Sequence, residues 1–186
     1  MPTGGNANNG ANKSKYSLVV YDAQEITSFD CQSIDELLKQ TDPARVNWIT
    51  VRDVHDEEEM SKLLRHFNVD PVILPDVLDE TQVAFESEYE DCLYLEYMVP
   101  FYDEKQQRLV QSRGSFILTT NALILYEHQL HGLFSRTRRR ALNHLTHVME
   151  HGPDYLLYLL IRAVIVEHFQ HGFKHLAHQL EELEDR

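Results

Sequence analysis

The stretch Gly152-Pro153-Asp154-Tyr155-Leu156-Leu157-Tyr158 opens a segment that runs to Arg186 with no helix breaker stronger than Gly172. Proline is favoured at the first position of a helix, and an acidic residue beside it suits the positive end of the helix dipole. This stretch therefore predicts that a helix begins at Pro153. A helix that continued to Arg186 would be about 50 Å long at 1.5 Å per residue, which exceeds what a small domain needs for its own core.

The apolar residues of this segment change their spacing along its length. Between Leu156 and Ile165 they are dense enough to be buried on more than one face, under the rest of the chain. Farther on they alternate between spacings of four and three, which predicts a seam that packs against other helices, formed by Phe169, Phe173, Leu176, Leu180 and Leu183. The last turn is acidic, which is unfavourable at the negative end of a helix. We therefore expect this helix to continue beyond Arg186 in a longer protein.

Composition indicates an acidic globular domain. The 186 residues carry a formal net charge of −13, which argues against a nucleic-acid partner and makes cations the more natural small ligands. The charge is concentrated between Arg52 and Asp91, where thirteen acidic residues face three Arg or Lys. No apolar run reaches membrane-spanning length. Cys31 and Cys92 lack the spacing of a disulfide framework, so we expect two inert core thiols in a reducing compartment.

Strands and helices alternate at first, and strands then follow one another. Residues 1–14 are rich in Gly and Asn, so we expect a disordered leader. Residue patterns predict strands at 16–21, 25–29, 47–51, 91–99, 113–119 and 122–126, and helices at 33–39, 56–67, 72–78 and 130–150. This order predicts an α/β layered domain with a mixed β-sheet over residues 15–150, followed by a long helix over 151–186.

Several motifs together resemble a known family. They are the segment 70–78, the spaced residues Gln82, Glu86, Tyr89 and Asp91, the strand segment 115–118 and the segment 152–158. They look like the cytoplasmic domain of CorA-type divalent cation transporters, which carry Mg²⁺ or Co²⁺, over roughly residues 16–186. The resemblance implies an α/β/α domain whose last long helix is a stalk leading to two transmembrane helices. It also implies a homopentamer in the cell inner membrane, with this region in the cytoplasm.

The resemblance further implies how such a domain is regulated. Mg²⁺ bound between neighbouring cytoplasmic domains holds the subunits closed, and loss of the ion lets carboxylates repel one another. Mg²⁺ prefers carboxylate oxygens and keeps bound waters, which suits weak sites between two surfaces. Asp76 matches the family's acidic residue at such a site, and Glu167 matches one on the last helix. The alternative for Asp76 is a plain aspartate on a helix surface.

The sequence departs from the family at some of these positions. Pro75 precedes Asp76, where relatives commonly have a second acid. On the last helix Arg162 and Val166 stand where the family pattern has aspartates, which leaves Glu167 as the acidic match. These departures predict a weaker carboxylate site than the family pattern has.

Histidines suggest a second kind of metal site. Spacings of three, four and three place four of the eleven on one arc of an α-helix, away from the apolar seam: His168, His171, His175 and His178. Histidines three or four residues apart on a helix can share Zn²⁺ or Co²⁺. This interpretation favours a zinc-transporting branch of the same superfamily, and the alternative is a polar, solvent-facing helix surface. A similar row precedes Gly152, formed by His144, His147 and His151.

Two other classes of function compete with a transporter domain. The first is a soluble oligomeric scaffold whose last helix packs against copies of itself. The second is a metal-dependent hydrolase that uses the histidines. The sequence has no nucleophile elbow, phosphate-binding loop or His-Glu-x-x-His motif, so we predict that the chain is not an enzyme.

Overall fold

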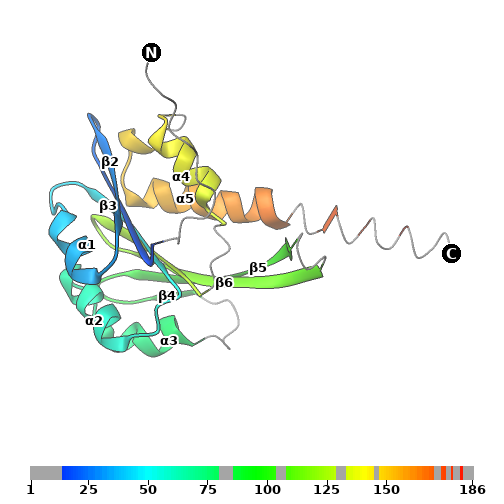
Figure 1. The fold of residues 1–186 in the computed structure, drawn as a ribbon, viewed down its shortest axis with the longest axis horizontal. Helices are drawn as coiled ribbons and strands as arrows, with labels where there is room; N and C mark the ends of the chain where they lie inside the picture. Colours follow the sequence, from blue (N-terminus) through cyan, green and yellow to red (C-terminus); the bar gives the residue numbers. More distant parts are fainter. Residues whose placement is uncertain are drawn as a thin grey trace, which may run out of the picture.

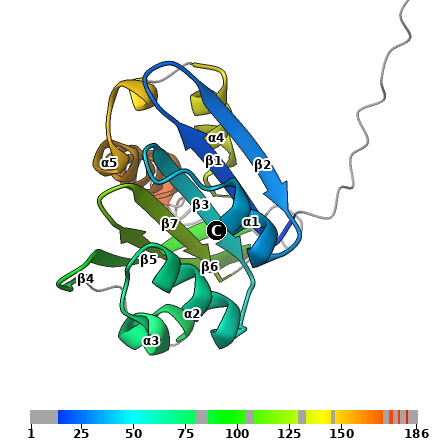
Figure 2. The same ribbon diagram turned by 90° about the vertical axis from the view of Figure 1, so that its left-hand side faces the viewer.

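The computed structural model describes residues 14–79, 86–103, 108–128, 133–144, 147–169, 173–174, 177 and 181. Within these ranges, strands form one seven-stranded sheet in the order β2-β1-β3-β7-β6-β5-β4. Helices cover both faces of the sheet, which gives three layers (Figure 1 and Figure 2). The predicted α/β/α fold with a mixed sheet is confirmed.

Two antiparallel groups of strands meet at a parallel pairing. In the first group β1 (Tyr16–Tyr21) lies between β2 (Ile26–Cys31) and β3 (Val46–Arg52) and is antiparallel to both. The second group consists of antiparallel neighbours: β4 (Glu86–Glu88), β5 (Leu93–Asp103), β6 (Arg108–Leu118) and β7 (Ala122–Glu127). β3 and β7 join the groups and run parallel, with Ile49 opposite Ile124.

One face of the sheet carries the helices of two connections, from β2 to β3 and from β3 to β4. They are α1 (Ile34–Gln40), α2 (Glu57–His66), the 3₁₀ turn η1 (Pro71–Ile73) and α3 (Leu74–Leu78). Ser33 caps α1 by accepting from the Glu36 N–H at 3.2 Å, and Asp56 caps α2 in the same way. Leu37, Met60 and Val77 lie in the core cluster between these helices and the sheet.

The opposite face carries α4 (Ser135–Leu142), the 3₁₀ turn η2 (His147–Glu150) and α5 (Pro153–Ala163). α5 begins as predicted, with Pro153 in its first turn and Asp154 beside it. Its side chains Leu156 and Leu160 are fully buried in a second core cluster that includes Trp48 and Phe116. Because both faces are covered, β7 is buried at every position, as an apolar central strand should be.

Gly114 provides the space for a buried aromatic ring. It lies directly opposite Tyr97 in the pairing of β5 with β6. A Cβ atom at Gly114 would lie 2.7 Å from Tyr97 Cζ and would also meet the Tyr97 hydroxyl and the Tyr126 carbonyl. The Tyr97 ring instead packs against Phe116 and Phe134, at centroid distances of 5.0 and 5.7 Å. The glycine therefore permits an aromatic contact that joins β5 to the α4 side of the core.

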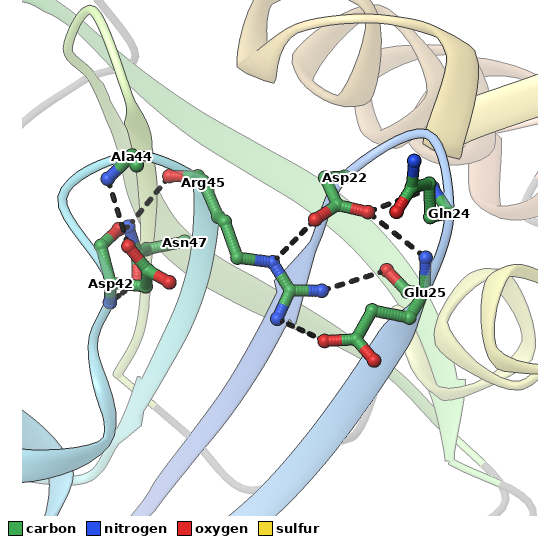
Figure 3. Close-up of polar contacts among 7 residues, drawn as sticks. All are labelled: Asp22, Gln24, Glu25, Asp42, Ala44, Arg45 and Asn47. Atoms are coloured by element: carbon green, nitrogen blue, oxygen red, sulfur yellow. Dashed lines mark hydrogen bonds and ion pairs between the residues drawn. The ribbon is translucent and has the colours of Figure 1, made fainter.

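Arg45 fastens the β1–β2 turn to the start of β3 (Figure 3). Its guanidinium forms ion pairs with Asp22 at 3.0 Å and with Glu25 at 2.7 Å. The fully buried Asn47 closes the loop that precedes β3, because its amide donates to the carbonyls of Asp42 at 2.7 Å and Arg45 at 3.0 Å. These contacts fix the position of β3, the strand through which the two halves of the sheet are joined.

The helix predicted at 130–150 is wrong. α4 ends at Leu142, and the separate 3₁₀ turn η2 follows. His144, between them, has a φ of 54°, and this left-handed backbone cannot continue an α-helix. The short strand β4 was not predicted, since its residues Glu-Ser-Glu have no apolar pattern.

The long C-terminal helix is described in part. α5 passes at Val164 into a π-helix that ends at Phe169, and residues 173, 174, 177 and 181 are helical. The rest of the predicted stalk up to Arg186, and all but the last residue of the leader predicted at 1–14, lie outside the described residues. Within the described ranges, the helices are too short or too polar to cross a bilayer.

Candidate functional site

Asp76 lies in the first turn of α3, directly after Pro75, and is half-buried. Its neighbour Val77 is fully buried, which anchors this short helix to the core. The Tyr89 hydroxyl donates a hydrogen bond to Asp76 Oδ2 at 3.0 Å. Burial and this bond raise the pKa of Tyr89, so the hydroxyl keeps its proton and stays a donor. Tyr89 therefore orients the Asp76 carboxylate where α3 meets the turn that precedes β5.

Glu96 of β5 places a second carboxylate near Asp76. It is 8% exposed, and its Oε2 atom has no hydrogen-bond partner among the described residues. Burial raises the pKa of Glu96, the charge of Arg113 opposes this rise, and the charges of Asp79 and Asp76 add to it. The charges of Asp76 and Asp79 thus both act on Glu96, as does the charge of Arg113. We call these three carboxylates the acidic group.

Sequence analysis proposed Asp76, whose metal role stays a prediction, and it did not point to Glu96 or Tyr89. Residues two apart in a strand share a face, so Glu96 lies on the same face as Tyr94, which is fully buried under the α1–α3 layer. A glutamate on a strand face that helices cover is unusual, and this pattern could have pointed to Glu96. No sequence pattern indicated the hydrogen bond from Tyr89 to Asp76, because this bond depends on where the turn between β4 and β5 lies relative to α3.

The acidic group does not form a complete metal cage. Across the described part of the chain, no three His, Cys, Asp or Glu side chains are placed to hold a metal ion together. Mg²⁺ commonly takes one or two carboxylates and keeps several waters. Asp76 offers one carboxylate of the kind that such a site uses, and its role as a metal ligand stays a prediction.

The predicted metal residues of the last helix fall at the limit of the described chain. Glu167 and His168 lie in the π-helix Val164–Phe169, whereas His171, His175 and His178 lie outside the described residues. A π-helix closes i→i+5 hydrogen bonds instead of i→i+4, so α-helical spacing does not hold through His168. The histidine arc and the metal roles of Glu167 and His168 stay predictions.

The histidines before Gly152 do not lie in a row on one helix. His144 occupies a left-handed turn, His147 lies in η2, and the His151 ring packs on Tyr155 with centroids 4.3 Å apart. His147 Nδ1 lies within hydrogen-bond distance of Glu150 Oε1, at 3.0 Å. The predicted helical row is wrong because the backbone changes direction at His144.

Comparisons by sequence identify related proteins. The family model for CorA-like Mg²⁺ transporter protein matches residues 43–186. The cobalt/magnesium transport protein CorA of Thermotoga maritima is 24% identical over 149 residues, which are 80% of this chain and 42% of that protein. The chain therefore spans less than half the length of this curated relative.

Comparisons by structure find the same fold. The complete structure of the CorA magnesium transporter from Methanocaldococcus jannaschii matches 91% of this chain and 50% of that chain, with a TM-score of 0.69 and 20% identity. The soluble domain of CorA from the same organism matches 90% of this chain and 63% of that chain, with a TM-score of 0.65 and 20% identity.

Proposed function

Because this chain belongs to the family of CorA-like Mg²⁺ transporter proteins, we propose that it is the metal-sensing and assembly domain of a divalent cation transporter for Mg²⁺ or Co²⁺. The observation that carries the proposal is the acidic group, in which Tyr89 holds the Asp76 carboxylate and the charges of Asp76 and Asp79 act on the buried Glu96. The family is one of ion transporters, which supports a role other than catalysis. In the full-length protein this region lies on the cytoplasmic side of the inner membrane.

Sensing in this proposal depends on repulsion among carboxylates. Asp76 contributes one ligand to a Mg²⁺ site shared with a neighbouring subunit, and Tyr89 holds that carboxylate in place through its 3.0 Å hydrogen bond. Asp79 and Glu96 add negative potential at the same place. Bound cation neutralises this potential and keeps subunits together. Without the cation, like charges favour separation of the subunits.

Assembly in this proposal uses the last helix. Large apolar side chains are exposed along it, with 54% exposure at Tyr158, 54% at Ile165 and 63% at Phe173. Phe173 lies against Phe169 at a centroid distance of 6.2 Å. Exposed apolar surface of this kind is typical of a contact with another protein surface. It supports packing against further copies of the chain, as a homopentamer in the full-length protein.

Calorimetric titration of the metal-free chain with Mg²⁺, with the mass followed by light scattering, tests the proposal. We expect millimolar binding that raises the mass and is lost in Asp76→Asn. Asp35→Asn is the matched control, because Asp35 lies in the first turn of α1 but is exposed and paired with Lys62. Binding that is equal in Asp76→Asn and wild type would remove Asp76 from the sensor.

A separate titration with Zn²⁺ tests the zinc alternative. Tight Zn²⁺ binding without a Mg²⁺ response, abolished by replacing His171 and His175 together, would favour the zinc-handling branch. An unaltered Zn²⁺ signal in that variant would place the zinc site elsewhere. The absence of both signals would leave the oligomeric scaffold as the better account.

A further inference from the structure

A pocket of about 580 Å³ lies between α4 and the strands β2, β3 and β7. It is on the α4–α5 face of the sheet, opposite the face that carries the acidic group. Trp48, Phe134 and Leu142 line its apolar part, and Arg52, Arg138 and Arg139 line its charged part. Its volume and mixed lining are typical of sites for small organic molecules.

The lining of the pocket carries an excess of positive charge. Its three arginines are accompanied by two carboxylates, those of Asp30 and Glu127. Arg52 is paired with Glu127 at 3.1 Å, and both side chains are largely buried. In a chain whose net charge is −13, this local excess is unusual and favours an anion.

Arg138 is a largely buried cation of the pocket with a distant carboxylate partner. Its side chain is 15% exposed, yet the carboxylate paired with it, that of Asp30, is 3.8 Å away and 72% exposed. Its guanidinium donates to the hydroxyls of Ser17 and Ser28, the latter at 2.7 Å. Burial is the main cause that lowers the pKa of Arg138 and the charge of Arg52 adds to it, whereas the charges of Asp30 and Glu127 oppose it. An anion beside Arg138 would therefore offset the cost of burying its charge.

Trp48 contributes a buried aromatic ring to the wall of the pocket. It is 2% exposed, and its indole Nε1 is closed to solvent. The ring therefore extends the apolar part of the lining, and its fluorescence can report on what enters the pocket.

We propose that this pocket binds a small organic anion through carboxylate or phosphate oxygens. Arg138 and Arg139 provide the charge, and Trp48, Phe134 and Leu142 form the wall that contacts the apolar part of the ligand. Inorganic phosphate has no apolar atoms to contact this wall. An organic anion therefore binds more tightly than inorganic phosphate. The site is independent of the cation site proposed at Asp76, since the two lie on opposite faces of the sheet.

The fluorescence of Trp48 tests this site directly, because Trp48 is the single tryptophan of the chain. The metal-free 186-residue chain is titrated at low ionic strength with citrate, ATP and inorganic phosphate. We expect a saturable change with citrate or ATP, and an affinity about tenfold weaker in Arg139→Gln. Arg140→Gln is the matched control, since Arg140 is the next residue of α4, is exposed and does not line the pocket.

The possible outcomes separate the explanations. Equal weakening in Arg139→Gln and Arg140→Gln would indicate general attraction to a basic helix and would overturn the proposal. So would the absence of a saturable change with all three anions. Saturation by inorganic phosphate at the same concentration as citrate and ATP would overturn the preference for an organic ligand. Arg138→Lys provides a second check, because it keeps the charge and loses the planar fork, and we expect it to weaken binding too.

Discussion

Replacing Glu96 by Gln is expected to stabilise the domain at neutral pH and to weaken its affinity for Mg²⁺. The carboxylate is 8% exposed and lies near Asp76 and Asp79, with Oε2 unpaired among the described residues. A buried group in this state costs about 1–3 kcal/mol, and loss of the attraction to Arg113 offsets part of the gain. We expect a net gain of about 1 kcal/mol, or about 2–4 °C in Tm.

The gain should depend on pH in a defined direction. The pKa of Glu96 is raised above its ordinary value of 4.5, so the folded state favours the protonated carboxyl. The stability that this protonation contributes is fully present below pH 4.5 and is lost as the pH rises through the folded-state pKa. Gln cannot ionise, so the advantage of Glu96→Gln is greatest at pH 7–8 and disappears near pH 4.

Thermal unfolding followed by circular dichroism between pH 4 and pH 8 measures this difference. Glu90→Gln is the control, because it makes the same change of charge at an exposed glutamate in the turn before β5. In calorimetry, loss of one carboxylate from the acidic group should weaken Mg²⁺ binding about fivefold, which corresponds to about 1 kcal/mol. A lower Tm for Glu96→Gln at pH 7.5, or an advantage that persists at pH 4, would refute the reasoning.

Three further substitutions test the fold and the assembly. Gly114→Ala should destabilise the domain by about 2–3 kcal/mol, since the new Cβ meets the Tyr97 ring; denaturant unfolding measures this, and a change below about 0.5 kcal/mol would contradict the packing described. Asn47→Ala should cost about 2–3 kcal/mol, because it leaves buried groups of the loop before β3 unpaired; an unchanged urea midpoint would show that the loop does not need it. Phe173→Asp should lower the mass of any oligomer in light scattering without changing Tm, since Phe173 is 63% exposed; an unaffected mass would remove this position from the interface.

Sequence patterns predicted the features that local signals determine. The start of α5 at Pro153, the cap at Ser33 and the helix α2 all follow from neighbouring residues. The prediction of one helix at 130–150 was wrong, because the spacing of apolar residues does not indicate a left-handed residue such as His144.

The sites were harder to predict than the elements that carry them. Asp76 came from the family resemblance. The hydrogen bond from Tyr89 to Asp76 and the effect of the Asp76 charge on Glu96 depend instead on where α3 lies relative to β5 and to the turn that precedes it. The pocket beside α4 could not be predicted from the sequence: the run of arginines in α4 is visible there, but its juxtaposition with Arg52 of β3 joins segments that are distant along the chain.

The parallel pairing of β3 with β7 also bears on how the chain folds. Each antiparallel group forms from strands that are close along the chain, whereas this pairing brings Asn47 beside Ala122. Pairings between distant segments form slowly because the intervening chain must first be ordered. We expect the joining of the two groups to limit the rate of refolding. Until β7 is synthesised, the free edge of β3 is open to pairing with other chains, so chains that end between Arg52 and Ala122 should aggregate most readily.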